Sequence, residues 1–143
     1  MRKIKRSDLL VFYEQQLDIE ALQMADFPSR EKDAFLTHWA KIMVDGSNYL
    51  RTILYNGQVA GNIVSFMMNG KREVGYWIGK QYWGKGIATN ALRQFLQIVH
   101  DRPLYAYTAK HNIASQRVLQ KCGFRLHIET EKETGWVLNS PPA

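Results

Sequence analysis

Residues 81–88 read Gln-Tyr-Trp-Gly-Lys-Gly-Ile-Ala, and the interpretation of the rest of the chain depends on them. They follow a strand-like run at residues 73–78 and open an apolar run with helical spacing at residues 87–99. Two glycines therefore fall where a strand turns into a helix. The first backbone N–H groups of a helix lack internal partners and lie at the positive end of its dipole, so this turn is predicted to hold a phosphate group.

Two common phosphate-binding turns match only part of this pattern. A Walker A loop, G-x-x-x-x-G-K-S/T, fits Gly79 to Lys85, but Gly86 replaces the hydroxyl that would hold Mg²⁺. A Rossmann turn, G-x-G-x-x-G/A, fits Gly84 and Gly86 and fails at Thr89. The sequence therefore lacks one required residue of each pattern.

Three strands are predicted just before the turn. Residues 49–55 and 58–68 flank Asn56-Gly57, and Asn69-Gly70 joins the second strand to residues 72–79. Strands joined by such tight turns pair antiparallel. Walker A and Rossmann folds place a helix between parallel strands, so the predicted strand meander also disfavours them.

A third pattern, Q/R-x-x-G-x-G/A, fits Gln81, Gly84 and Gly86 and resembles the phosphate-binding turn of the GNAT N-acetyltransferases. The second signature of that family, roughly N-x-x-S/A-x-x-x-L/Y-x-K-x-G-F, resembles residues 112–124, Asn-Ile-Ala-Ser-Gln-Arg-Val-Leu-Gln-Lys-Cys-Gly-Phe. Residues 73–124 as a whole resemble the branch of ribosomal-protein N-terminal acetyltransferases (RimJ/RimL-like). Each motif alone is a weak indicator, and the two at this separation are a specific one.

The resemblance implies an α/β (α+β) GNAT fold with a single domain over residues 1–143. Its mixed, mostly antiparallel central sheet has six to seven strands and helices on both faces, and it splays between the strands at residues 73–79 and 103–108. The patterns themselves predict further strands at residues 2–5, 124–131 and 135–138, and helices at residues 8–24, from Ser29 to about 45, 87–99 and 112–123, with Ser7, Ser29 and Asn112 as N-caps.

The resemblance also implies acetyl-CoA as acetyl donor and no metal. Its pyrophosphate would lie on the glycine turn and its pantetheine arm in the gap between the splayed strands, with a backbone N–H near Ile78 facing the thioester oxygen. The predicted cofactor-binding residues are Trp77, Ile78, Gly79, Gln81, Trp83, Gly84, Lys85, Gly86, Ile87, Ala88, Thr89, Asn112 and Ser115.

Glu73 is the predicted catalytic base, because many relatives carry a glutamate at this position of the strand before the turn. By two-residue alternation it shares a strand face with Gly75 and Trp77. A carboxylate beside an aromatic wall could have a raised pKa, which suits a base near neutral pH. The alternative is an exposed glutamate paired with Lys71 or Arg72.

The acid departs from the usual family pattern. Leu119 occupies the position where relatives often place a tyrosine, and the ribosomal-protein branch assigns the role to the serine of N-x-x-S, which makes Ser115 the candidate. Tyr105 and Tyr107 are alternatives. A serine has no suitable intrinsic pKa, so orienting the sulfur or binding pantetheine is the more plausible role for Ser115. Asn112 is expected to bind the pantetheine amides, or simply to cap its helix.

Four further residues have open roles. Asp26, His38 and Trp39 are possible acceptor-pocket residues, although a packed tryptophan and a hydrogen-bonded histidine are the commoner explanation. Cys122 replaces a residue that is normally apolar in the motif, and it is predicted to lie in the core and not to act as a nucleophile.

Composition sets the remaining expectations. The chain has 143 residues, a formal net charge of +6 and one cysteine, which cannot form an internal disulfide. The start of the chain has basic residues but no apolar signal-peptide region, so a cytoplasmic protein is expected. No run approaches the ~20 apolar residues of a membrane span, so no membrane partner is expected. The basic residues are scattered, which favours a solvated surface over direct nucleic-acid binding.

The expected partners are acetyl-CoA and an amine acceptor, either a small molecule or a protein N-terminus, with the chain a monomer or homodimer. The sequence does not identify the acceptor. The alternative function is a GNAT-fold module that binds acyl-CoA without turnover or has become an interaction module. An intact set of cofactor residues favours the enzyme.

Overall fold

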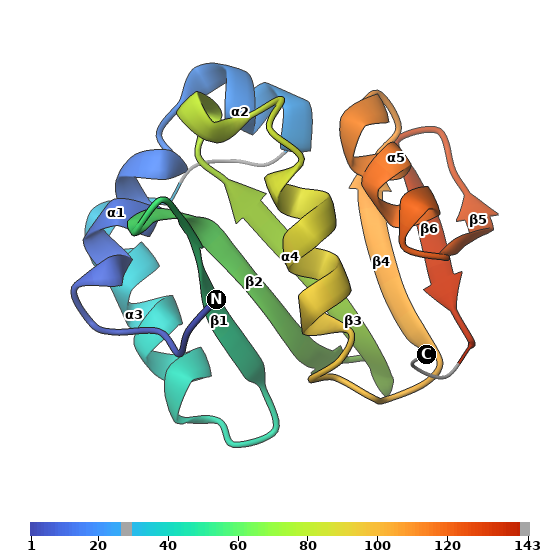
Figure 1. Cartoon of the computed structure of the whole chain (residues 1–143), viewed down its shortest axis with the longest axis horizontal. Helices are drawn as coiled ribbons and strands as arrows, with labels where there is room; N and C mark the ends of the chain where they lie inside the picture. Colours follow the sequence, from blue (N-terminus) through green and yellow to red (C-terminus); the bar gives the residue numbers. More distant parts are fainter. Residues whose placement is uncertain (27–29, 141–143) are drawn as a thin grey trace.

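The fold is built on one mixed sheet in the computed structural model, which describes residues 1–26 and 30–140 (Figure 1). Strands β3 (Lys71–Ile78) and β4 (Leu104–Ala109) pair in parallel, and the other four strand pairs are antiparallel. The predicted mixed, mostly antiparallel sheet is therefore confirmed. In sheet order, the strands are β1 (Tyr49–Tyr55), β2 (Gln58–Met68), β3 (Lys71–Ile78), β4 (Leu104–Ala109), β6 (Glu133–Leu138) and β5 (Arg125–Glu129).

Two Asn-Gly turns join the first three strands, as predicted. Asn56 and Gly57 have φ values of 51° and 78°, and Asn69 and Gly70 have φ values of 52° and 76°. Positive φ at both central residues is the geometry of a tight hairpin turn, which asparagine and glycine adopt more readily than other residues. The meander β1–β2–β3 follows from these two dipeptides.

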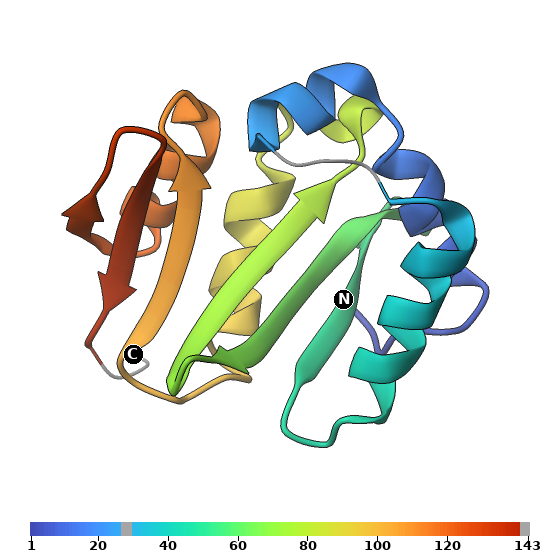
Figure 2. The ribbon, with the colours of Figure 1, turned by 180° about the vertical axis from the view of Figure 1, so that it is seen from behind.

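The parallel pair β3–β4 is very short. Only two residues of each strand are in register, Arg72 with Leu104 and Glu73 with Tyr105. Beyond them the strands separate, and the gap widens toward the C-terminal ends of both strands (Figures 1 and 2). The predicted splay between these strands is confirmed.

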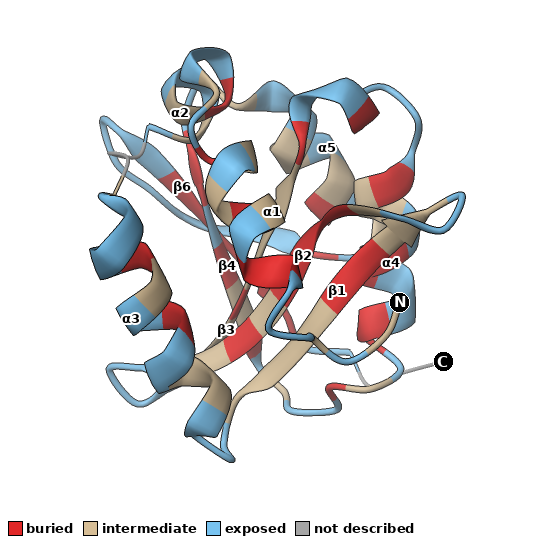
Figure 3. Cartoon of the chain, turned by 90° about the vertical axis from the view of Figure 1, so that its left-hand side faces the viewer, coloured by how far each residue is buried: buried red, intermediate tan, exposed pale blue. Residues whose placement is uncertain are grey.

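Helices cover both faces of the sheet, as Figure 3 shows edge-on. Side chains of α1 (Asp8–Gln15) and α3 (Lys32–Val44) form one buried cluster with part of β2, and α4 (Ile87–Phe95) and α5 (Ile113–Lys121) pack on the other face. A 3₁₀ turn, Lys80–Tyr82, precedes the glycine turn. The helices are α1 (Asp8–Gln15), α2 (Ile19–Ala25), α3 (Lys32–Val44), α4 (Ile87–Phe95) and α5 (Ile113–Lys121).

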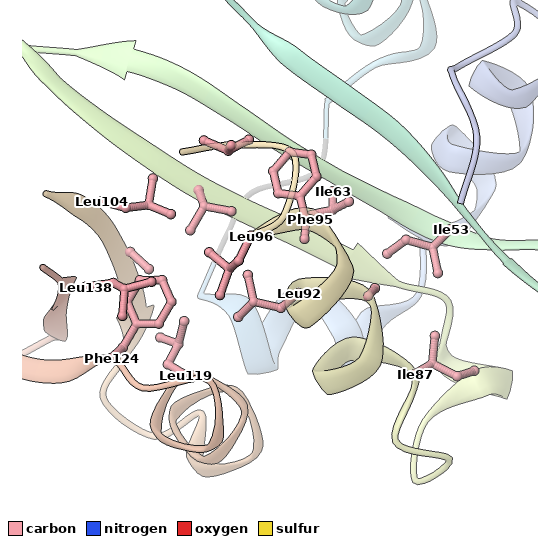
Figure 4. Packing of buried hydrophobic residues seen from close by; sticks show 14 of the residues in the cluster. Ile53, Ile63, Ile87, Leu92, Phe95, Leu96, Leu104, Leu119, Phe124 and Leu138 are labelled. Atoms are coloured by element: carbon pink, nitrogen blue, oxygen red, sulfur yellow. The ribbon is translucent and has the colours of Figure 1, made fainter. Parts of the chain in front are cut away.

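The main core lies between the sheet and the α4–α5 pair. Figure 4 shows Leu92 and Phe95 of α4 and Leu119 of α5 directed toward the same buried cluster as Ile63 of β2 and Leu104 of β4. All five are at most 1% exposed. Burying one such side chain contributes about 1.5–3 kcal/mol, so this cluster holds the two helices against both sides of the splay.

The predicted helix at residues 8–24 is wrong, because it is two helices. At Asp18 the backbone is extended, and the carboxylate accepts a hydrogen bond from the Ala21 N–H at 3.0 Å, which caps α2. Ser7 stands at the N-cap of α1 without a side-chain bond; the Asp8 carboxylate accepts from the Lys5 N–H at 2.9 Å instead. The apolar spacing continues through the break and could not reveal it.

Other boundaries also differ from the predictions. Residues 2–5 form no strand but a single bridge, Arg2 to Thr52. Helix α4 ends at Phe95, four residues before the predicted end. Glu31 stands at the N-cap of α3, and the predicted cap, Ser29, lies outside the described residues.

In residues 1–26 and 30–140, no helix combines the length and the apolar character needed to span a bilayer.

Candidate active site

The splay opens into a cleft of about 470 Å³. Its walls come from α2, the open end of β3, the glycine turn with the start of α4, and α5. Ten of the thirteen predicted cofactor residues line this single cleft: Trp77, Ile78, Trp83, Gly84, Gly86, Ile87, Ala88, Thr89, Asn112 and Ser115.

The glycine turn presents free backbone donors to the cleft. Gly84 and Gly86 have φ values of 75° and 72°, a conformation that favours glycine. Gly86 is the N-cap of α4, and its carbonyl accepts from the Asn90 N–H at 3.1 Å. The N–H groups of residues 87–89 therefore have no acceptor inside the helix, and these residues border the cleft. Such an array suits an anionic group such as a phosphate.

The wall formed by β3 contains a residue that the motifs did not single out. The hydroxyl of Tyr76 lies 2.6 Å from Oγ of Ser115 on α5, so this hydrogen bond crosses the gap between the two walls. Burial raises the pKa of Tyr76 to about 12. Two-residue alternation from Glu73 places Tyr76 on the other strand face, but no pattern in the sequence pairs it with α5.

Asn112 and Ser115 are joined at the start of α5. Oδ1 of Asn112 accepts from the Ser115 N–H at 3.2 Å, so the predicted helix cap is confirmed. Both residues line the cleft. Their contacts with a cofactor stay predictions.

Three predicted cofactor residues lie outside this cleft. Gly79 and Gln81 line a separate hollow beside Gln58. The ammonium of Lys85 lies over the ring of Tyr55, 5.9 Å from its centroid. A cofactor role for these three also stays a prediction.

Glu73 lies at the paired end of β3, outside the lining of the cleft. Burial raises the pKa of its carboxyl group, the negative charge of Glu133 raises it further, and Lys71 opposes both. The direction agrees with the expectation from the sequence, but the second cause is a carboxylate and not an aromatic wall. By strand alternation Glu73 and Tyr76 face opposite sides of the sheet, so Glu73 and Ser115 are not neighbours.

The expected partners of an exposed Glu73 are engaged elsewhere. The Arg72 guanidinium lies 3.3 Å from the Asp101 carboxylate. The ammonium of Lys71 lies 4.9 Å from the centroid of the Tyr105 ring. No salt bridge joins Glu73 to either basic neighbour in the described part of the chain.

Tyr105 and Tyr107 lie on β4, on the face that Glu73 shares, because Glu73 and Tyr105 are paired in register. Tyr105 packs against His127 with ring centroids 5.5 Å apart. Figure 2 shows that, among the described residues, no helix covers this face of the open end of β3 and of β4. The two tyrosines are therefore on the side of the sheet away from Ser115.

The residues with open roles are dispersed. Asp26 lines a polar hollow with Lys110 and Glu131, and His38 is exposed on α3. Trp39 is buried in the α1–α3 cluster, which supports its structural explanation. Cys122 is half-buried, and burial raises the pKa of its thiol, so its environment does not activate a thiolate.

Comparisons with known proteins identify the domain type. The model of the acetyltransferase (GNAT) domain family matches residues 1–125. The Bacillus subtilis (strain 168) protein YdaF, whose name assigns it provisionally to the ribosomal N-acetyltransferases, is 30% identical over 96 residues, 63% of this chain and 52% of that protein. The chain thus spans about half the length of this curated relative.

Solved structures share the fold at low sequence identity. A GNAT-family acetyltransferase from Bacillus anthracis has a TM-score of 0.79 at 19% identity, covering 96% of this chain and 92% of that one. RimL, a ribosomal L7/L12 alpha-N-protein acetyltransferase in complex with coenzyme A, has the same TM-score of 0.79 and the same coverages of 96% and 92% at 15% identity. Spermidine N-acetyltransferase from Vibrio cholerae, in complex with CoA and spermine, has a TM-score of 0.79 at 16% identity, covering 96% of this chain and 92% of that one.

The family model matches residues 1–125, most of the chain, and this range includes the splayed strands, the glycine turn and both motifs. This chain belongs to the family of GNAT acetyltransferase domains.

Proposed function

We propose that this chain is an acetyl-CoA-dependent N-acetyltransferase that transfers the acetyl group to a primary amine by direct attack in a ternary complex. One observation carries the proposal: a single cleft in the splay joins the free N–H groups of the glycine turn to Ser115 of α5. Gly84 and Gly86 leave open space where side chains would project, so an anionic group can approach the backbone closely.

The residues of the cleft fit a molecule with a pyrophosphate and an extended arm. The N–H groups of residues 87–89 would hold the pyrophosphate, and the backbone of β3 from Tyr76 to Ile78 would hold the arm. Acetyl-CoA supplies a thioester that is already activated, so the reaction needs no metal. The chain's task is to hold the two reactants together and to move protons.

Two protons must move in this reaction. The C–N bond forms as the C–S bond breaks with its electron pair going to sulfur, one proton leaves nitrogen, and one proton reaches the sulfur. We assign the first transfer to Glu73, whose raised pKa supports a base role. We assign the interaction with sulfur to Ser115, in the cleft.

The splay would let these two residues act from opposite faces. The amine would enter over the uncovered face that Glu73 and Tyr105 share, while the thioester lies in the cleft on the Ser115 side. The acceptor class we propose is a small amine or a protein N-terminus. Among the similar proteins, RimL is named as a protein N-acetyltransferase and the Vibrio cholerae protein as a spermidine N-acetyltransferase.

We further infer a cytoplasmic monomer or homodimer without direct nucleic-acid binding. Its one cysteine needs no oxidising compartment, and its net charge of +6 suits an anionic donor substrate.

The test is an acceptor screen. The protein is mixed with acetyl-CoA and a panel of polyamines, aminoglycosides, amino-acid derivatives and peptides, and release of the CoA thiol is followed with a thiol-reactive dye. Mass spectrometry of the product must show one added acetyl group. CoA binding without turnover across the panel would favour the alternative, a binding module, and absence of CoA binding would contradict both.

A further inference from the structure

The hydrogen bond between Tyr76 and Ser115 joins two residues that are 39 positions apart in sequence and lie on opposite walls of the cleft. The splay makes room for it, because β3 and β4 have already separated beyond Glu73. The Tyr76 ring packs against the main hydrophobic cluster, where a phenylalanine would fill the same apolar space. The hydroxyl is therefore the part of Tyr76 that packing does not require.

Both partners in this hydrogen bond are held in place. Ser115 is fixed at its backbone by Asn112 Oδ1, 3.2 Å from its N–H. Among the described residues, the hydroxyl of Tyr76 is the only hydrogen-bond partner of the Ser115 hydroxyl. A phenol is a stronger acid than an aliphatic alcohol, so the phenol is the preferred donor. The serine proton is then left free for an acceptor in the cleft.

We propose that Tyr76 is a positioning residue: by donating to Ser115 it holds the serine hydroxyl ready to donate to the sulfur that leaves in the acetyl transfer. This inference rests on the proposed function and adds a residue to it. The hydrogen bond from Ser115 favours the transition state over the bound substrate, because a thiolate accepts a stronger hydrogen bond than a thioester. The second hydroxyl, from Tyr76, polarises the first and strengthens that bond further.

The pair stabilises the leaving sulfur without giving up the phenol proton. The pKa of Tyr76 is about 12, well above the value of about 8.5 for an ordinary thiol, so proton transfer from the phenol to the sulfur is uphill. The phenol therefore stays protonated across the range in which an acceptor amine becomes neutral. The sulfur takes its final proton from solvent.

A double-mutant cycle tests the coupling. Tyr76→Phe should lower kcat by about 2-fold to 10-fold, the worth of one hydrogen bond, with little change in CoA affinity or melting temperature. Ser115→Ala should lower kcat at least as much, and the double variant should equal Ser115→Ala alone. Tyr55→Phe, which removes a phenol hydroxyl from the same cluster, is the control and should leave kcat unchanged. If the double variant instead lowered kcat by the product of the two single effects, the residues would act independently and the proposal would be overturned.

A second readout needs no acceptor. The thiol pKa of bound CoA, measured from the ultraviolet absorbance of the thiolate, should be lower than that of free CoA in the wild type and should rise in Tyr76→Phe. Turnover with no change in Tyr76→Phe would refute the positioning role and leave the enzyme intact. A Tyr76-dependent thiol pKa without turnover would support the positioning role and refute the enzyme. CoA that fails to bind would refute both.

Discussion

The two ends of β3 differ in what they do for the protein. At one end, Arg72 and Glu73 pair with β4 and close the sheet. At the other end, Tyr76 to Ile78 lie beside the cleft and make no ladder with β4. One carbonyl released there has another partner, because the indole N–H of Trp83 donates to the Ile78 carbonyl at 2.9 Å. A strand that gives up its neighbour gains a surface for recognition, provided that its buried backbone groups are satisfied.

Removing the carboxylate at the paired end should have the largest effect on turnover. If Glu73 removes the amine proton, Glu73→Gln should lower kcat by about 10²-fold to 10⁴-fold and leave CoA affinity unchanged. A base acts when deprotonated, so wild-type activity should fall as pH drops through the raised pKa of Glu73, and this acidic limb should vanish in the variant. Wild-type turnover in Glu73→Gln would move the base to the acceptor side, where Asp26 and His38 would be tested next.

Glu73→Gln should lower turnover without lowering the stability of the fold. A carboxyl whose pKa is higher in the folded state than in the unfolded state loses stability as pH rises between those two values. Glu73→Gln should therefore not lower the free energy of unfolding at neutral pH. Denaturant unfolding measures this, and a clear loss of stability would show that Glu73 is a structural residue.

The core at the paired end should matter most for stability. Leu104 is 0% exposed, so Leu104→Ala should cost about 2–5 kcal/mol in the free energy of unfolding. Leu126 on β5 is 55% exposed, and Leu126→Ala is a matched control expected to change stability by about 0.5 kcal/mol or less. Equal costs for the two variants would contradict the assignment of the core to this side of the splay.

An added charge at the open end should affect CoA binding alone. Thr89 lies at the third position of α4 and borders the cleft, so Thr89→Glu places a carboxylate near the proposed pyrophosphate while suiting the helix N-terminus. CoA affinity should fall about tenfold, or about 1.4 kcal/mol. Asn90→Glu carries the same charge change at an exposed neighbour outside the cleft lining and should change affinity less. Calorimetry that shows equal affinities for the two variants would place the phosphate elsewhere.

Local patterns predicted most of the fold. The Asn-Gly dipeptides predicted both hairpins, and the glycine turn between a strand and a helix predicted the start of α4. The division of residues 8–24 into α1 and α2 was missed because Asp18 caps a helix inside a continuous apolar pattern. Such a break depends on one side-chain hydrogen bond and leaves the periodicity intact.

The site was predicted in part, for a similar reason. Motif residues such as Gly86 and Asn112 carry their role in their local spacing, and the structure brings them to one cleft. The proposed role of Tyr76 depends on Ser115, a residue of another element, so no pattern in the sequence indicates the pair. Contacts between distant elements are decided by packing and not by the pattern of either segment.

The open end of β3 and the glycine turn are proposed to hold CoA together. A titration with CoA followed by backbone amide shifts in two-dimensional NMR tests it most directly, residue by residue. The largest shifts are expected at residues 87–89 and at residues 76–78, with small shifts at the paired Arg72 and Glu73. Shifts confined to other elements on saturation with CoA, or no shifts at all, would contradict it.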